Sequence, residues 1–351
     1  MSEIYTSLSI SLIARRNFVI HTRDYNQTLA HTNEVIGPLF EPDQTGVIDL
    51  LAQVQNEPNQ EVAIQNIARE MLVKQEDGTY RLKTILIWKN LEFVPAEFQR
   101  HRLNRLLDEI NEFDTVESRL KRNDFIRVSG LGPIHKPSLF CIIPIVTIGN
   151  TRRKFDQYLK QHFWFSQLDF HPPLTTEHES YLETIYKLRS MMRQVFASPD
   201  IQRYVYSLVI FTRTHRLCLL APIETRVPTG TIDSIETLAK CLVLWQQYLT
   251  KLDPPRLFVT PEFCKVAYRK IGYWLVDWET NKLFNDPAPD EPTEALKKLE
   301  INVLTGDWYA SEYHYVKKYL EKYRSLQDES SSVGFLNLLV EDVLDSVRPP
   351  I

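Results

Sequence analysis

The segment Thr84-Ile85-Leu86-Ile87-Trp88 decides the fold, because four consecutive apolar residues follow the threonine. A half-exposed strand alternates apolar and polar residues, whereas a strand inside a parallel sheet is covered on both faces and shows little alternation. The segment therefore predicts an interior strand of a parallel sheet, in which Leu86 is fully buried between helices.

The segments around this strand show two alternating patterns. Short apolar runs predict strands, and apolar residues spaced three or four apart predict helices. The predicted strands are 17–20, 47–50, 139–148 and 163–165, and the predicted helices are 27–39, 61–72 and 95–110. Because strands separated by helices need crossover connections, this part of the chain is predicted to be an α/β domain with a parallel sheet.

The pattern changes near residue 175, after which only helical periodicity remains. The predicted helices are 177–196, 201–217, 231–249, 261–278, 311–323 and 332–347. The proline- and acid-rich stretch 285–292 predicts a linker. The sequence therefore predicts three parts: an α/β domain over 1–174, a helical lid over 175–284, and a linker with C-terminal helices over 285–351.

The composition is that of a folded globular protein. The chain has 351 residues, 43% of them hydrophobic, and a formal net charge of −4 from 41 basic and 45 acidic residues. This balance indicates neither a membrane nor a nucleic-acid partner. Four widely spaced cysteines without a C-x-x-C pair favour reduced, buried thiols. The sequence shows no signal peptide and no apolar stretch of membrane-spanning length, so we expect an intracellular protein of the cytoplasm or nucleus.

Three segments of the second half resemble a known group of proteins. Asp200–Arg216 and Thr231–Tyr248 are similar to lid helices of AAA+ ATPases of the MoxR and magnesium-chelatase branch, and Val259-Thr260-Pro261-Glu262 is similar to the start of a later lid helix. The chain most resembles the fungal maintenance-of-telomere-capping protein 2 family, a degenerate relative of those ATPases. The resemblance implies an AAA+-like parallel sheet flanked by helices, an all-α lid, and a genetic association with telomere capping.

The chain departs from those ATPases at the residues that bind nucleotide. Their phosphate-binding loop needs glycines, so that backbone N–H groups can surround the phosphates, and a lysine that neutralises phosphate charge. The corresponding stretch, His21 to Thr28, has no glycine, and no Gly-Lys pair occurs anywhere in the chain. Lys89 and Asn90 stand where an acidic pair would hold Mg²⁺.

The two arginines expected from the resemblance are also missing. Gln161-His162 stands in place of the arginine finger, and Ile232-Asp233-Ser234 in place of the second sensor arginine. We therefore expect no cofactor, no catalytic residue and no enzymatic activity, and predict a non-catalytic AAA+-like interaction or scaffold protein. Two alternatives remain open: a nucleotide-binding but non-hydrolysing AAA+-like oligomer, and a weak binder of single-stranded nucleic acid. The protein partner is unidentified, and a second copy of the chain is one alternative.

Other motifs add no catalytic or metal-binding residue. The nine histidines show no metal-ligand spacing, and no G-x-S-x-G motif of hydrolases occurs. Gly130-Leu131-Gly132-Pro133 is predicted to be a turn instead of a phosphate loop, because Pro133 lacks a backbone N–H.

Two surface features are candidate binding sites. The densest basic cluster is Arg152, Arg153 and Lys154, a candidate anion contact whose alternative is an ordinary solvated surface. The final helix carries an apolar stripe that docks either on its own chain or in the groove of a partner or second copy. The residues of this stripe taken as a candidate docking surface are Leu336, Leu339, Val340, Val343 and Leu344.

Overall fold

The computed structural model describes residues 3–76, 78–112, 125–128, 132–147, 155–168, 180–220, 227–251, 255–276, 315, 318–319, 321–322 and 337–350. Contacts divide the chain into two compact units. Unit 1 comprises residues 1–197 and 237–263, and unit 2 comprises residues 198–236 and 264–351. The predicted parts, 1–174, 175–284 and 285–351, are consecutive stretches of sequence, whereas the two units are defined by contacts. The predicted division therefore stays a prediction.

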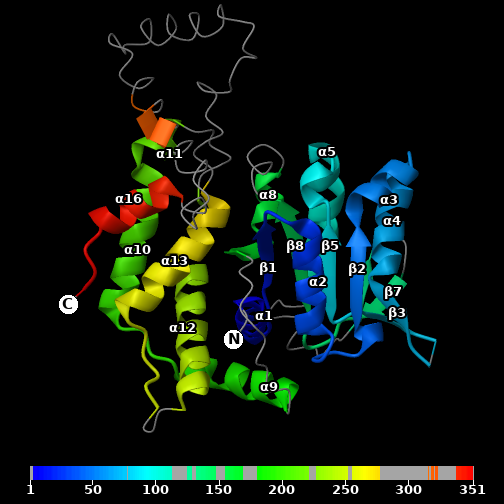
Figure 1. Ribbon diagram of the computed structural model, residues 1–351, viewed down its shortest axis with the longest axis horizontal. Helices are drawn as coiled ribbons and strands as arrows, with labels where there is room; N and C mark the ends of the chain where they lie inside the picture. Colours follow the sequence, from blue (N-terminus) through cyan, green and yellow to red (C-terminus); the bar gives the residue numbers. More distant parts are fainter. Residues whose placement is uncertain are drawn as a thin grey trace, which may run out of the picture. The chain divides into compact units, whose positions relative to one another are not determined.

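Unit 1 contains a five-stranded parallel sheet (Figure 1). Its strand order is β2-β5-β8-β1-β9, and all four pairings are parallel. The strands are β1 (Asn17–Thr22), β2 (Thr45–Asp49), β5 (Ile85–Lys89), β8 (Cys141–Thr147) and β9 (Phe163–Leu168). With the helices that flank the sheet, this arrangement confirms the predicted α/β domain with a parallel sheet.

Strand β5 confirms the prediction made for the segment that decides the fold. It lies between two parallel neighbours, since Ile87 is in register with Val47 of β2 and with Ile143 of β8. Leu86 is completely buried. Because both faces of the strand are covered, each of its apolar side chains contributes about 1.5–3 kcal/mol of burial energy to folding.

The helices of unit 1 follow most of the predicted segments. They are α1 (Glu3–Ala14), α2 (Tyr25–Ile36), α3 (Leu50–Asn56), α4 (Gln60–Glu70), α5 (Ala96–Phe98), α6 (Asn104–Asn111), α8 (Gln157–Lys160) and α9 (Tyr181–Met191). The predicted helix 95–110 is interrupted by a π-helical turn at Gln99–Leu103. Helix α12 (Thr231–Thr250) has residues in both units.

Helix α1 was not predicted, because it is buried nearly all round. Its serines alternate with apolar residues, so the sequence lacks an amphipathic stripe. Ser9 is buried, and its hydroxyl donates a hydrogen bond to the carbonyl of Tyr5 at 2.8 Å. Tyr5 in turn packs against the rings of Tyr181 on α9 and Trp245 on α12, with centroid distances of 5.4 and 5.7 Å. Helix α1 is therefore a core element of unit 1.

A second, four-stranded sheet also escaped prediction. Its order is β3-β4-β7-β6, formed by Leu72–Lys74, Tyr80–Leu82, Gly132–His135 and Phe125–Val128. The predicted turn at Gly130–Pro133 is wrong for Gly132 and Pro133, which lie in β7. Strands of three or four residues are too short to show a period of two in the sequence, which explains why the sequence did not reveal them.

Unit 2 is helical in its described residues. Its helices are α10 (Pro199–Thr214), α11 (Arg216–Leu220), most of α13 (Pro261–Leu275) and α16 (Leu338–Ser346). Helix α16 contacts α10 and α13, and Glu341 forms a two-pronged ion pair with Arg269 of α13, with closest N–O distances of 2.8 Å. The close approach of α16 to α13 occurs at Gly272, where an added Cβ would lie 2.7 Å from Cγ2 of Val340.

Gly272→Ala should destabilise the protein. Alanine is favoured over glycine inside a helix by about 1 kcal/mol, but the clash with the stiff, β-branched Val340 should outweigh that gain and leave a net loss of about 1–3 kcal/mol. Chemical denaturation measures this loss. As a matched control, Gly230→Ala introduces a Cβ with no heavy atom within 4 Å and should change stability by less than about 0.5 kcal/mol.

A second variant separates the clash from other effects. In the Gly272→Ala background, Val340→Ala should cost less stability than it does in the wild type, because it removes the clashing methyl group. Additive effects of the two substitutions would contradict a close contact between α13 and α16.

Candidate functional site

Open α/β sheets bind their ligands at the carboxyl ends of the strands. In unit 1 this edge is formed by the residues that end β1, β2, β5 and β8, and by the segments that follow them. It is also the edge at which the sequence analysis placed the missing nucleotide motifs. The side chains there decide what the edge can hold.

The N-terminus of helix α2 follows β1 and is occupied by a side chain of the protein itself. Asp24 is the N-cap, and its Oδ1 accepts the backbone N–H of Gln27 at 3.1 Å. The Thr22 hydroxyl accepts the Asp24 N–H at 3.1 Å and pairs with the Thr28 hydroxyl at 2.6 Å. A helix N-terminus attracts phosphate through its unpaired N–H groups and positive dipole end. Here a carboxylate already stands at that end and would repel a phosphate.

Lys89 and Tyr25 form a cation–π pair beside this cap. The Lys89 ammonium lies 5.4 Å from the centroid of the Tyr25 ring. The Tyr25 hydroxyl is buried and has no hydrogen-bond partner among the described residues. Burial, together with the carboxylates of Asp49 and Glu92, raises the pKa of Tyr25 above its ordinary value, so the phenol stays protonated.

Asn90 holds the carboxylate that ends β2. Its amide nitrogen donates to both oxygens of Asp49, at 3.0 and 2.9 Å. Asp49 also caps helix α3 by accepting the Ala52 N–H at 3.1 Å. Lys89 and Asn90 thus lie at the sheet edge predicted for the acidic pair. The nearby carboxylate of Asp49 is engaged in structural hydrogen bonds.

Glu92 is a buried acid that the sequence analysis missed. Its side chain is only 1% exposed, and its Oε1 accepts both the backbone N–H and the hydroxyl of Thr147, at 3.0 and 2.8 Å. The second oxygen, Oε2, is buried without a hydrogen-bond partner in the described part of the chain. Glu92 therefore ties the end of β5 to the end of β8. A lone acid in the apolar stretch Leu91–Val94 was the only signal in the sequence.

His21, at the end of β1, is a neutral histidine. It is almost fully buried, and burial together with the nearby Lys160 ammonium lowers its pKa from 6.5 to about 3. A protonated imidazole here would be both desolvated and next to a like charge. His21 therefore cannot supply a positive charge to a phosphate group at neutral pH.

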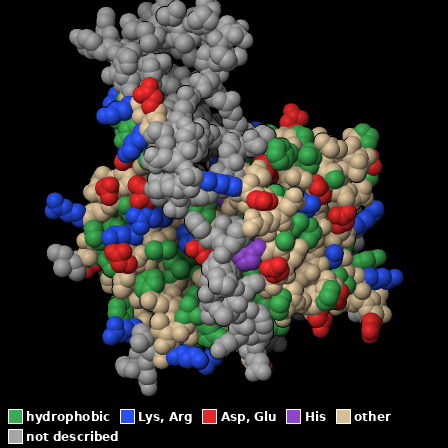
Figure 2. Space-filling model, in the orientation of Figure 1, with side chains coloured by type: hydrophobic (Ala, Val, Ile, Leu, Met, Phe, Trp, Pro, Cys, Tyr) green, Lys and Arg blue, Asp and Glu red, His purple; other side chains and the backbone are tan. Residues whose placement is uncertain are grey.

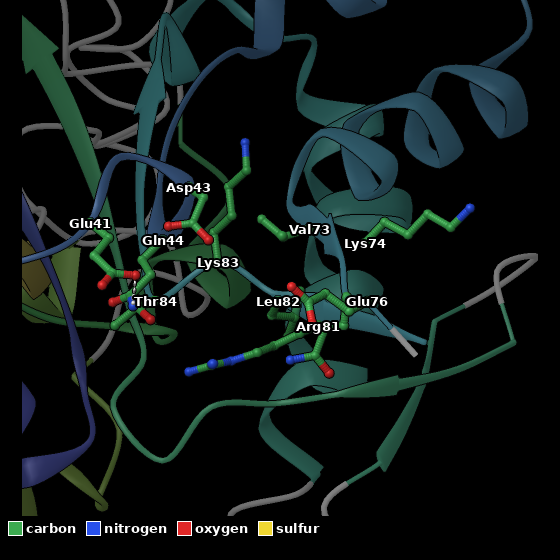
Figure 3. A pocket seen from close by; sticks show the side chains of 11 residues that line it. Glu41, Asp43, Gln44, Val73, Lys74, Glu76, Arg81, Leu82, Lys83 and Thr84 are labelled. Atoms are coloured by element: carbon green, nitrogen blue, oxygen red, sulfur yellow. Dashed lines mark hydrogen bonds between the residues drawn. The ribbon is translucent and has the colours of Figure 1, made fainter. Parts of the chain in front are cut away.

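A separate cavity of about 530 Å³ lies at the opposite ends of β2 and β5 (Figure 3). It is lined by Glu41, Asp43, Gln44, Val73, Lys74, Gln75, Glu76, Arg81, Leu82, Lys83 and Thr84. Three acidic and three basic side chains balance one another, and no nucleophile with an adjacent base is among them. The Lys83 stem lies against Gly46, where an added Cβ would be 2.8 Å away.

Figure 2 shows a similar mixture of acidic and basic side chains around α2 to α5.

The structure places the other candidate residues as follows. Arg152, Arg153, Lys154 and Leu336 lie outside the described residues. Leu339, Val340, Val343 and Leu344 are buried within unit 2, which corresponds to the alternative in which the final helix docks on its own chain. His162, which precedes β9, is mostly buried, and its Nε2 lies 2.7 Å from Oδ1 of Asn104 on α6.

The described residues show two further absences. No group of three or more His, Cys, Asp or Glu residues among them is arranged to hold a metal ion. Nor is any helix in the described ranges long and apolar enough to cross a membrane. All four cysteines are buried and free, as the sequence predicted.

Fold and sheet edge together define a parallel α/β protein whose carboxyl edge carries its own capping and pairing side chains. In sequence the chain is similar to Maintenance of telomere capping protein 2 of Lachancea thermotolerans, with 31% identity over 208 residues. This match covers 56% of the chain and 60% of the relative, and it agrees with the predicted resemblance.

Other comparisons are more distant. No model of a known protein family matches the chain. A solved structure of a "putative ATPase" from Cytophaga hutchinsonii aligns with 77% of this chain and 81% of its own, at 12% identity and a TM-score of 0.47.

The pKa of His21 predicts a specific dependence of stability on pH. The unfolded histidine binds a proton near pH 6.5, whereas the folded one binds it only near pH 3. Between these values the unfolded state holds more protons, so the free energy of unfolding must fall as the pH falls. His21 alone should account for a loss of about 1 kcal/mol between pH 6 and pH 5.

Urea denaturation at both pH values tests this prediction. His21→Gln, which cannot titrate, should lose less stability over this interval than the wild type, even if it is less stable at both pH values. An equal loss in the two proteins would show that His21 is not held neutral by the fold.

Proposed function

We propose that the protein is a non-catalytic, AAA+-like interaction or scaffold protein that acts in the maintenance of telomere capping. The observation that carries the first half of the proposal is the cap of helix α2. Asp24 places a negative charge where an ATPase of this fold needs N–H groups and a lysine to receive phosphates.

The rest of the carboxyl edge supports the same proposal. Lys89 pairs with the Tyr25 ring instead of a phosphate, and a lysine at this position would repel Mg²⁺. Asp49 and the Oε1 of Glu92 accept hydrogen bonds from Asn90 and Thr147. Each of these contacts stabilises the fold locally, and ATP with Mg²⁺ would have to displace them.

The second half of the proposal comes from the relative. The printed name of the protein from Lachancea thermotolerans associates it with telomere capping. A chain without nucleotide chemistry would contribute to such a process by binding other proteins. The proposal implies a nuclear location. Purification of the tagged chain from nuclei, followed by mass spectrometry, would identify those partners.

A thermal melt with and without 1 mM ATP and Mg²⁺ tests the loss of nucleotide binding. A ligand present at about 100 times its dissociation constant adds about 2.7 kcal/mol of stability, which shifts the midpoint by several degrees. We expect no shift with ATP, and no release of phosphate above the buffer value. Inorganic triphosphate serves as the control for non-specific anion effects.

A rise of the midpoint with ATP but not with triphosphate would contradict the proposal. If phosphate release were still absent in that case, the protein would be the nucleotide-binding, non-hydrolysing alternative. Phosphate release that depends on the protein would make it an enzyme.

A further inference from the structure

Two phenylalanines lie paired and exposed on the surface of unit 1. Phe196 and Phe258 form an isolated parallel β-bridge, in which the Phe196 N–H donates to the Leu257 carbonyl and the Val259 N–H donates to the Phe196 carbonyl, both at 2.9 Å. Their side chains are 63% and 51% exposed. Residues opposite each other in a bridge direct their side chains to the same face. The bridge therefore directs both aromatic side chains to one face, where they are exposed to solvent.

The neighbouring backbone keeps this aromatic pair in place. Val195 and Val259, next to the two phenylalanines, are buried. Just before Phe196, Met192 contacts Cys241 of helix α12, with the sulfur atoms 3.6 Å apart. The pair is thus fixed on a packed part of unit 1, and an aromatic platform fixed in this way loses little conformational freedom when a ligand binds.

Two arginines lie close to the aromatic pair along the chain. Arg193 precedes Phe196 by three residues, and Arg256 precedes Phe258 by two. Both side chains are exposed and form no ion pair with any residue in the described ranges.

We propose that the aromatic pair and these two arginines bind single-stranded nucleic acid. Bases stack on exposed aromatic rings whatever their sequence, and lysine and arginine contact the phosphates between them. A protein partner would instead be expected to meet a broader apolar patch with a polar rim. The site is distinct from the carboxyl edge of the sheet. A result on ATP binding therefore neither supports nor contradicts this proposal.

The experiment measures fluorescence anisotropy of a labelled 15-nucleotide oligo(dT) with the full chain at about 50 mM salt. Phe196→Ala with Phe258→Ala should weaken binding by about thirty-fold or more, because loss of one stacked base costs about five- to a hundred-fold and two rings are removed. Phe196→Tyr with Phe258→Tyr should retain it, because tyrosine also stacks. The matched control is Phe211→Ala, which removes a ring that is 48% exposed on α10 of unit 2 and should leave binding unchanged.

Salt dependence and a second probe complete the test. Arg193→Ala with Arg256→Ala should reduce the slope of log K against log salt by about 1.4, since each phosphate contact on a single strand contributes about 0.7. Oligo(U) of the same length shows whether RNA is bound as well as DNA.

The proposal is wrong if oligo(dT) does not bind, or if the two alanine substitutions at Phe196 and Phe258 leave binding unchanged in a protein with an unaltered melting point. Equal competition by heparin against wild type and the Phe→Ala variant would also overturn it, because charge alone would then explain the binding.

Discussion

The burial of β5 and β8 on both faces is the constraint on which the rest of unit 1 depends. Two adjacent strands without alternation can be covered only if helices lie over both faces of the sheet. Parallel pairing then forces each connection to cross over the sheet, which places the ends of β1, β2, β5 and β8 along one edge. The polar groups that follow these strands must find hydrogen-bond partners there. Asp24, Asp49 and Glu92 supply some of these partners.

Side chains of the protein itself therefore stabilise this edge. A capping aspartate satisfies the first turn of α2, and the hydrogen bonds of Glu92 join the segments that end β5 and β8. Each contact is worth about 0.5–2 kcal/mol, and the bonds to a charged carboxylate lie in the upper part of that range. The edge is therefore stable without phosphate. A glycine-rich loop would leave its N–H groups unpaired until a ligand arrived.

The sequence was sufficient to predict the parallel sheet, because the runs at Asn17–Ile20, Thr84–Trp88 and Leu139–Ile148 are longer and more apolar than solvent-exposed strands tolerate. It was insufficient for α1, whose serines are satisfied inside the core, and for the short strands of the second sheet. Lys89 and Asn90 were predicted at the sheet edge from the resemblance, but their actual partners, Tyr25 and Asp49, are distant in sequence. Glu92 was invisible for the same reason. The role of this buried acid can be recognised only when its hydrogen-bond partner, Thr147, is known.

The position of β1 has a consequence for how the protein folds. Although β1 comes first along the chain, it lies between β8 and β9, so that Ile20 is in register with Ile145 and Val19 with Ser166. During synthesis, β1 has neither sheet partner until β8 is complete at Thr147, and it lacks the second one until β9 is complete at Leu168. Pairings between such distant segments slow folding and leave an apolar strand exposed to other chains in the meantime. The first strand along the chain, which ends up between two neighbours in the finished sheet, is thus the one that waits longest for its partners.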